Sequence, residues 1–268
     1  CAALTSAPES VDNPGEYYRQ NVGDMTYLLE IAARNSIPVV FSSSAAVYGP
    51  TGDTGIVTED HPLDPPNPYG LTKMIGEKML DDWGLQYVAL LYFNVAGADP
   101  HLRCGPRGNP GTLFSNILKA SDEGTPVKLY KADDGSYEGS GFPRRDFIHP
   151  TDLAVAHAAA VESLLSGDEI NEALNVGTGQ SYSTMEVFQK FHFRNRALAA
   201  EQAPPRPGDP PCVVANADRI KKVLGWEATG LSKLDTMVET AWQWHRKIKP
   251  KKLAKFEGPK NRSSGFLD

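Results

Sequence analysis

The 268 residues suffice for one large domain or two smaller ones, and 40% hydrophobic and 22% charged residues argue against a disordered chain. With 33 acidic and 27 basic side chains the formal net charge is −6, which argues against general nucleic-acid binding, since that needs a basic face. Apolar runs fall short of the roughly 20 residues of a membrane helix and no signal peptide opens the chain, so no membrane partner and a cytoplasmic location are expected.

The cysteines and the first residue bear on covalent cross-links and on where the chain begins. Cys1, Cys104 and Cys212 are odd in number and contain no Cys-x-x-Cys pair, so neither a disulfide framework nor a metal site is expected. Residue 1 is not Met, and patterned helix follows soon after it. We therefore expect a truncated or processed chain.

The first part of the chain alternates predicted helices and strands. Apolar side chains recur every three or four positions over 15–34, which predicts an amphipathic helix. A nearly all-apolar run at 37–41 predicts a strand covered on both faces. A second helix is predicted at 69–83 and a second buried strand at 87–93. This alternation predicts an α/β fold with a doubly wound parallel sheet.

The second part has longer irregular segments. Loops are predicted at 101–111 and 131–145, and loops of this length in compact domains are commonly functional. An Ala-rich helix is predicted at 152–166, followed by a strand-like run at 173–176. A final helix is predicted at 233–247.

Two groups of polar residues point to chemistry at the end of the first strand. Ser42, Ser43 and Ser44 follow that strand, at the edge of a parallel sheet where ligands bind. Tyr69 and Lys73 lie one turn apart on the same face of the second helix. A nearby ammonium lowers the pKa of a phenol and makes it a usable base, while Ser44 can share the substrate hydroxyl. Each feature alone is common, but together they predict a catalytic site.

The segments SSSAAVYG and NPYGLTK, in this order, resemble the extended short-chain dehydrogenase/reductase family, and within it the nucleotide-sugar 4-epimerases. The resemblance covers nearly the whole chain. It implies a tightly bound NAD and the interconversion of UDP-glucose and UDP-galactose through transient oxidation at C4. Ser44, Tyr69 and Lys73 would be the catalytic residues, with Tyr69 taking the sugar 4'-hydroxyl proton. It also suggests a homodimer formed through helices 15–34 and 69–83.

The resemblance implies two domains. Residues 1–96 would form a Rossmann domain for NAD whose N-terminal part, including the Gly-rich turn, is missing, and 146–165 would return to it. A smaller α/β domain, built from 97–145 and 166–248, would bind the nucleotide sugar. Residues 249–268 would form a basic, flexible tail.

Binding residues follow from the same resemblance. The predicted contacts to NAD are made by Ala3, Thr5, Gln20, Ser42, Ser43, Tyr69, Lys73 and Tyr92. The predicted contacts to the UDP-sugar are made by Ser44, Phe93, Asn94, Thr112, Leu113, Tyr130, Arg145, Arg206 and Asp209. Two arginines suit a diphosphate, because guanidinium groups bind phosphate oxygens bidentately. The resemblance also implies that Tyr130 stacks on uracil and that Asp209 binds a ribose hydroxyl.

Residues that depart from related patterns separate the possible activities. Ala45 and Ala46 stand where related dehydratases carry acidic groups, which favours epimerisation over loss of water. Thr5 and Gln20 stand where Lys and Asn are usual, which weakens the expected grip on NAD. Two alternatives stay open: a UDP-xylose/UDP-arabinose 4-epimerase, and a non-catalytic fragment or pseudoenzyme that binds nucleotide sugars.

Overall fold

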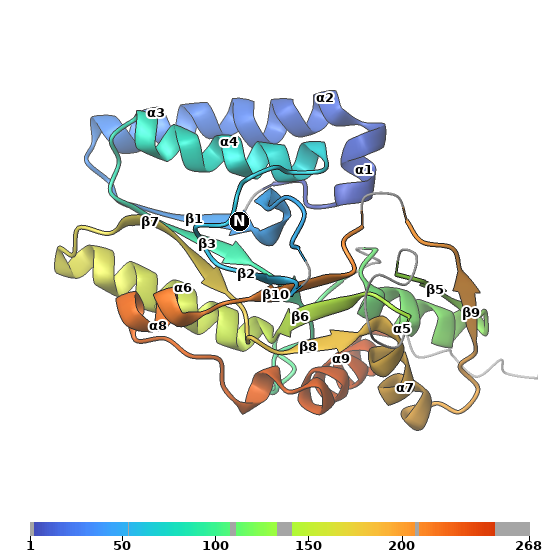
Figure 1. Ribbon diagram of the computed structural model, residues 1–268. Helices are drawn as coiled ribbons and strands as arrows, with labels where there is room; N and C mark the ends of the chain where they lie inside the picture. Colours follow the sequence, from blue (N-terminus) through green and yellow to red (C-terminus); the bar gives the residue numbers. More distant parts are fainter. Residues whose placement is uncertain (1–2, 53, 108–110, 133–140, 207–208, 250–268) are drawn as a thin grey trace, which may run out of the picture.

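A three-stranded parallel sheet forms the centre of one half of the computed structural model (Figure 1). Its order is β1 (Val39–Ser44), β3 (Tyr87–Tyr92) and β7 (Asn171–Val176). Ser44 is in register with Tyr92, so the carboxyl ends of the strands meet at one edge. The structure describes residues 3–52, 54–107, 111–132, 141–206 and 209–249.

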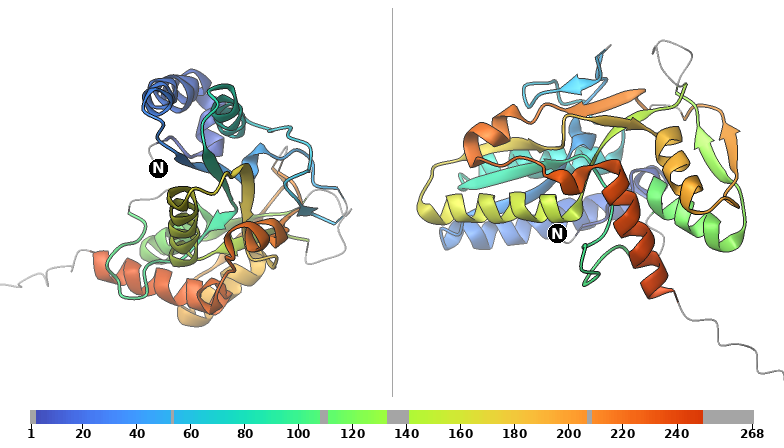
Figure 2. Two further views of the ribbon diagram at one scale, coloured as in Figure 1. Left: turned by 90° about the vertical axis from the view of Figure 1, so that its left-hand side faces the viewer. Right: turned by 90° about the horizontal axis from the view of Figure 1, so that it is seen from below.

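Helices cover both faces of this sheet (Figure 2). α3 (Asp24–Arg34) and α4 (Pro68–Asp82) lie on one face, and α6 (Pro150–Ser166) and α8 (Asp218–Leu224) lie on the other. Alternate residues of β3 enter the two cores, since successive side chains of a strand point to opposite faces. The predicted α/β class with a doubly wound parallel sheet is confirmed.

A second sheet continues from the carboxyl edge of the first. Its order is β2 (Ile56–Val57), β10 (Cys212–Ala215), β6 (Arg144–Ile148) and β4 (Asn94–Val95). These strands are parallel, and β8 (Ser181–Ser183) pairs antiparallel with β6. Because β4 follows β3 almost directly, side chains of the second sheet lie beside the carboxyl ends of the strands of the first sheet.

The remaining elements pack around an aromatic core beside the second sheet. They are α5 (Leu113–Glu123), α7 (Thr184–Arg194), α9 (Leu234–Ile248) and the parallel pair β5 (Val127–Tyr130) and β9 (Ala200–Ala203). The ring of Phe114 lies 5.7 Å from that of Phe147 and 5.2 Å from that of Phe191, between ring centroids. This core fixes α5, whose first turn faces the candidate site.

The helical run at the front is more complex than predicted. α1 (Ala7–Asp12) precedes α2 (Pro14–Tyr17), which continues through a π-helical turn, Tyr18–Gly23, into α3. The predicted helix at 15–34 is therefore one helical run with a π turn inside it. Short 3-10 turns occur at Ala45–Val47 and Gly230–Ser232.

The first predicted strand was wrong in its bounds and in its burial. The strand spans Val39–Ser44 instead of 37–41, because the three serines continue the pairing with β3. Its side chains are mostly half-buried, since no strand among the described residues pairs with its other edge. The predicted loop at 131–145 ends earlier than expected, since β6 begins at Arg144.

Some predictions are not tested by these elements. Residues 108–110 and 133–140 of the predicted loops, and the tail from 250 onward, lie outside the described residues. The two-domain boundaries stay a prediction. Within the described ranges, no helix has the length and apolar character needed to cross a membrane.

Candidate active site

The first turn of α4 is fixed by two side-chain caps. Asn67 caps the helix, because its Oδ1 accepts a hydrogen bond from the Gly70 amide at 2.9 Å. The hydroxyl of Ser10, from α1, accepts a hydrogen bond from the Tyr69 amide at 3.1 Å. Pro68 occupies the first turn, where no amide hydrogen is needed. These contacts hold the backbone of Tyr69 in place.

Glycines let α4 approach β1 closely. A Cβ atom on Gly70 would lie 2.1 Å from the carbonyl oxygen of Ala46, and one on Gly76 would lie 2.6 Å from the ring of Phe41. At Gly70 the neighbour is a backbone oxygen, so only glycine fits there, whereas a side chain at Gly76 would require the Phe41 ring to shift. The close approach places Tyr69 beside the end of β1.

The three predicted catalytic residues meet at this junction. The Ser44 hydroxyl hydrogen-bonds to the Tyr69 phenol, and it also accepts a hydrogen bond from the Ala46 amide at 3.2 Å. Lys73 donates a hydrogen bond from Nζ to the carbonyl oxygen of Ser42 at 2.8 Å. Its Nζ lies 5.8 Å from the centroid of the Tyr69 ring. A base, a hydroxyl and a cation are thus held together by β1 and α4.

The pKa of Tyr69 differs from the sequence expectation. Burial raises it, and the hydrogen bond from Ser44 opposes that rise. The expected lowering by Lys73 was wrong for this structure, because the ammonium faces the Ser42 carbonyl and burial dominates. Burial also lowers the pKa of Lys73 to about 8, against the raising effect of Glu77. Lys73 is therefore still mostly charged at neutral pH.

A cavity of about 520 Å³ opens in front of Ser44 and Tyr69. All nine residues predicted to contact the UDP-sugar line it, as do Thr5 and Tyr92 from the predicted cofactor set. They come from β1, β4, α5, β5, β6 and the segment before β10. A volume of this size suits a ligand of nucleotide-sugar dimensions.

The same cavity is lined by two cationic groups. Arg145 forms an ion pair with Asp209, and its Nη1 donates a hydrogen bond to its neighbour's carbonyl at 2.8 Å. The guanidinium carbon of Arg206 lies 3.7 Å from the centroid of the Tyr130 ring. Uracil stacking on this face of Tyr130 would require Arg206 to move aside. The arginines thus lie where a diphosphate could reach both.

A second cavity, of about 240 Å³, lies on the other side of β1 and holds Ala3, Gln20, Ser42 and Lys73 from the predicted cofactor set. Asn21, beside Gln20, was not among the predicted residues; it is buried and hydrogen-bonds both backbone groups of Leu4, at 2.9 and 3.0 Å. Asn21 could have been predicted from the sequence, because it directly follows Gln20, a position where Asn is usual.

Glu77 was also missed, although it lies one helical turn beyond Lys73. Its carboxylate accepts a hydrogen bond from Ser43, whose side chain is buried and lines neither cavity. Burial raises the pKa of Glu77 to about 7. The i, i+4 spacing from Lys73 was the available signal. Among the described residues, no three His, Cys, Asp or Glu side chains gather as a metal-binding cluster.

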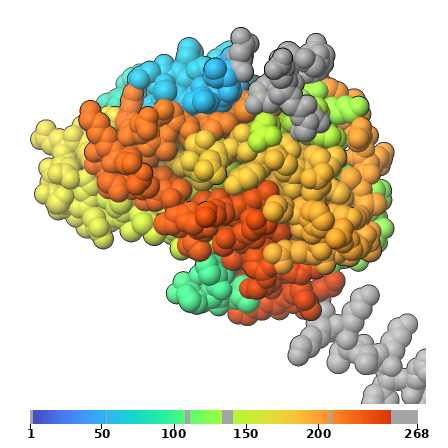
Figure 3. All heavy atoms as spheres, turned by 60° about the horizontal axis from the view of Figure 1, so that its bottom comes forward, coloured from blue at the N-terminus to red at the C-terminus, as the bar shows by residue number. Residues whose placement is uncertain are grey.

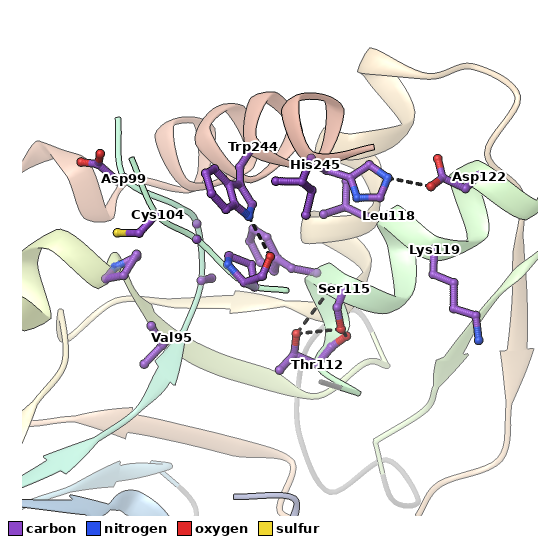
Figure 4. A pocket seen from close by; sticks show the side chains of 17 residues that line it. Val95, Asp99, Cys104, Thr112, Ser115, Leu118, Lys119, Asp122, Trp244 and His245 are labelled. Atoms are coloured by element: carbon purple, nitrogen blue, oxygen red, sulfur yellow. Dashed lines mark hydrogen bonds and ion pairs between the residues drawn. The ribbon is translucent and has the colours of Figure 1, made fainter. Parts of the chain in front are cut away.

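A third cavity, of about 550 Å³, lies between α5, α9 and the segment after β4 (Figure 4). Trp244 and His245 project into it from α9, and Asp122 of α5 binds His245 at 2.9 Å. Figure 3 shows the segment near residue 100, in green, against α9 in orange-red. Of the predicted site residues only Thr112 lines this cavity, so the predicted chemistry belongs to the other two.

The sequence matches the model of the NAD dependent epimerase/dehydratase family over residues 1–177. The chain belongs to this family. A UDP-glucose 4-epimerase of Halalkalibacterium halodurans in the same comparison is 40% identical over 253 residues, which cover 91% of this chain and 74% of that protein. An epimerase of the same description from Azospirillum brasilense is 38% identical over 256 residues, covering 90% and 70%.

Solved structures agree with this membership of the epimerase/dehydratase family. The UDP-glucose 4-epimerase of Brucella ovis in complex with NAD has a TM-score of 0.82 at 36% identity, covering 91% of this chain and 76% of that one. The enzyme of Bifidobacterium longum in complex with NAD+ and UDP has a TM-score of 0.80 at 32% identity, covering 92% and 75%. The family resemblance inferred from the sequence is confirmed.

Proposed function

We propose that this chain is a UDP-glucose 4-epimerase that acts with NAD and interconverts UDP-glucose and UDP-galactose. The observation that carries the proposal is the hydrogen-bonded pair Ser44 and Tyr69, beside Lys73, in the lining of a cavity that is also lined by Arg145 and Arg206. The named activity of its relatives supports the same reaction.

The residues beside β1 fit the cofactor that the family uses. Lys73 offers an ammonium and Ser42 a hydroxyl in the smaller cavity, and the Tyr69 phenol borders the larger one. Polar donors of this kind suit the ribose hydroxyls of NAD. When bound, NAD supplies the acceptor for the C4 hydride and returns that hydride to the sugar.

Tyr69 would act as the base for the sugar 4'-hydroxyl proton. Its phenol already shares a hydrogen bond with Ser44, which can orient the same hydroxyl of the substrate. The charge on Lys73 would favour the phenolate form of Tyr69 if its ammonium turned from the Ser42 carbonyl toward the phenol when substrate binds. Return of the proton from Tyr69 then completes the inverted sugar.

The turn after Ser44 favours epimerisation over dehydration. Ala45 and Ala46 form the first part of a 3-10 turn directly beside Ser44. Their methyl groups can neither donate nor accept a proton, so loss of water across C5 and C6 would lack an acid there. The 4-keto sugar would then take back its hydride instead of losing water.

The arginines would hold the diphosphate while the sugar turns over. Arg145 is paired with Asp209 in this structure, and a diphosphate would compete for its guanidinium. Asp209 would then be released to bind a ribose hydroxyl of the nucleotide. If the diphosphate is held by the arginines, the sugar itself stays free to turn and can present either face of C4 to the cofactor.

Tyr69→Phe tests the proposal. It removes the base but keeps the ring, so we expect hydride transfer to NAD to fall by at least about a thousandfold while UDP affinity changes less than about threefold. Stopped-flow absorbance of reduced nicotinamide and calorimetry with UDP measure the two effects. Tyr18→Phe, at an exposed tyrosine of the π-helical turn before α3, is the matched control. Normal turnover in Tyr69→Phe would refute the mechanism.

The two alternatives predicted from the sequence have separate tests. Comparing the turnover of UDP-galactose and UDP-arabinose distinguishes a hexose from a pentose epimerase. Equilibrium binding of NAD to this chain distinguishes an enzyme from a non-catalytic fragment. Submicromolar binding of NAD together with preferred turnover of UDP-galactose supports the proposal. Preferred turnover of UDP-arabinose argues for the pentose epimerase, and the lack of submicromolar NAD binding argues for the non-catalytic fragment.

A further inference from the structure

A chain of polar side chains crosses the central sheet behind the site. His157 projects from α6, on the face of the sheet opposite α4, and its Nε2 forms a short hydrogen bond with the Tyr92 hydroxyl at the end of β3. The Tyr92 hydroxyl lies 2.7 Å from Oγ of Ser42 on β1. The carbonyl oxygen of Ser42 accepts the hydrogen bond from Lys73.

The donor and the acceptor in each of these hydrogen bonds follow from counting the available protons. Nδ1 of His157 lies 3.0 Å from the carbonyl oxygen of Leu153, and a carbonyl can only accept, so Nδ1 carries the proton. In the neutral ring Nε2 is then an acceptor and receives the single proton of Tyr92. The Tyr92 oxygen in turn accepts a hydrogen bond from the Ser42 hydroxyl.

The hydrogen-bonded series connects residues that line the two cavities. Tyr92 lines the sugar cavity, and Ser42 lines the smaller cavity together with Lys73. Burial raises the pKa of Tyr92, and charge on Tyr69 raises it further, while the Ser42 hydrogen bond opposes both. Tyr92 therefore stays protonated when Tyr69 is charged, so its hydroxyl serves as a fixed structural contact.

We propose that His157 is a positioning residue. Acting through Tyr92 and Ser42, it holds the carboxyl ends of β3 and β1 in the register that places Lys73 against the reacting end of the site. The inference rests on the proposed function, because it is hydride transfer that this register serves. Small errors in such geometry cost rate much more than binding, since the proposed contacts to the diphosphate are made by other residues, Arg145 and Arg206.

The tautomer can be tested without cofactor. In nitrogen-15 NMR spectra of the full chain alone, we expect His157 at neutral pH with Nδ1 protonated and Nε2 unprotonated. Tyr92→Phe should shift the Nε2 resonance of His157 and leave that of His192 unchanged, because His192 hydrogen-bonds the Leu198 carbonyl through Nδ1, at 2.9 Å, away from Tyr92 in the chain of contacts. A His157 ring protonated at Nε2, or an Nε2 signal unaffected by Tyr92→Phe, would overturn the proposed chain.

Rates provide the second test. With NAD bound, His157→Leu should lower the rate of hydride transfer by about ten- to a hundredfold while KM for the UDP-sugar changes less than about twofold. His157→Gln keeps an acceptor and should recover most of the rate. His192→Leu is the matched control and should keep the parent rate.

A double-mutant cycle separates positioning from mere packing. If His157 acts through Tyr92, adding His157→Leu to Tyr92→Phe should slow hydride transfer by less than about twofold further. Full additivity of the two losses, or a parent rate in His157→Leu, would overturn the proposal. A parent chain that transfers no hydride would refute the proposed function instead, and the NMR result would still decide the arrangement of His157.

Discussion

Lys73 and Glu77 set the charge of the site at the scale of single residues. Burial shifts the pKa of the ammonium down to about 8 and that of the carboxyl up to about 7, so both titrate close to the working range. Each charge supports the other: Glu77 raises the pKa of Lys73, and Lys73 lowers that of Glu77. Activity should therefore decline above about pH 8, as Lys73 loses its proton.

Glu77→Gln tests this coupling. The folded pKa of Glu77, about 7, exceeds its unfolded value, so its contribution to stability is present below about pH 4.5 and is lost as pH rises through 7. Removing the buried charge should raise the free energy of unfolding at pH 8 by about 1 to 2 kcal/mol, measured by urea unfolding. It should also move the alkaline decline in rate to lower pH.

The control for this change is an exposed carboxylate on the neighbouring helix. Glu30 pairs with Arg34 at the surface, and Glu30→Gln should leave both the stability and the pH profile within experimental error. If activity in Glu77→Gln declines at the same alkaline pH as in the parent chain, the pKa of Lys73 does not depend on Glu77.

Single residues of the site were largely predictable, but their environment was not. The motif residues were found because strand ends and i, i+4 spacing place Ser44, Tyr69 and Lys73 by local geometry alone. The raised pKa of Tyr69 was missed, because its burial depends on α1 and α2, which no local pattern connects to α4. The edge-on contact of the Tyr17 ring, 6.5 Å from that of Tyr69, shows this packing.

At the scale of elements, the site depends on how closely α4 packs on β1. The turn after Ser44 lies directly against Gly70, and Phe41 lies directly against Gly76. The same contacts fix the distance between the base on the helix and the hydroxyl on the strand. Displacing the helix by even a small amount would separate the two catalytic groups.

Gly70→Ala should therefore destabilise the protein by about 2 to 3 kcal/mol and lower the rate of hydride transfer by at least about tenfold. Gly15→Ala is the matched control, since that helical glycine has no atom within 4 Å of its added Cβ, and alanine there should be neutral or stabilising. Thermal unfolding and single-turnover rates measure both. Equal effects of the two substitutions would contradict the close packing.

Apolar periodicity found the long elements and missed the short ones. The helices containing residues 24–34, 68–82, 150–166 and 234–248 were predicted because their apolar stripes are extended. α7 was missed although Ser183 and Glu186 form a capping box, a signal that the sequence carries. The π turn before α3 could not be predicted, because it depends on packing and has no local signature.

At the scale of the whole molecule, the homodimer stays a prediction. An exposed apolar face of α3 supports it. Tyr27, Leu28 and Ile31 of α3 are 69%, 66% and 56% exposed, and they follow one another at spacings that place them side by side on the helix. Pairing of this face with a second copy would cover them.

Ile31→Glu would place a charge in that face. We expect it to weaken the dimer by at least about tenfold, measured by sedimentation equilibrium, because an unpaired charge is costly at an apolar interface. Val155→Glu, at an exposed position of α6 on the opposite face, should leave association unchanged. A parent chain that stays monomeric at high concentration would exclude the homodimer.

The fate of the hydrogen at C4 tests the proposed reaction most directly. UDP-galactose carrying deuterium at C4 is turned over in ordinary water by the NAD-loaded chain, and the product is analysed by mass spectrometry and NMR. We predict UDP-glucose that retains the deuterium at C4, because Tyr69 exchanges only the hydroxyl proton while the hydride stays within the site. Loss of the deuterium to water, or no UDP-glucose from the NAD-loaded chain, would contradict this account.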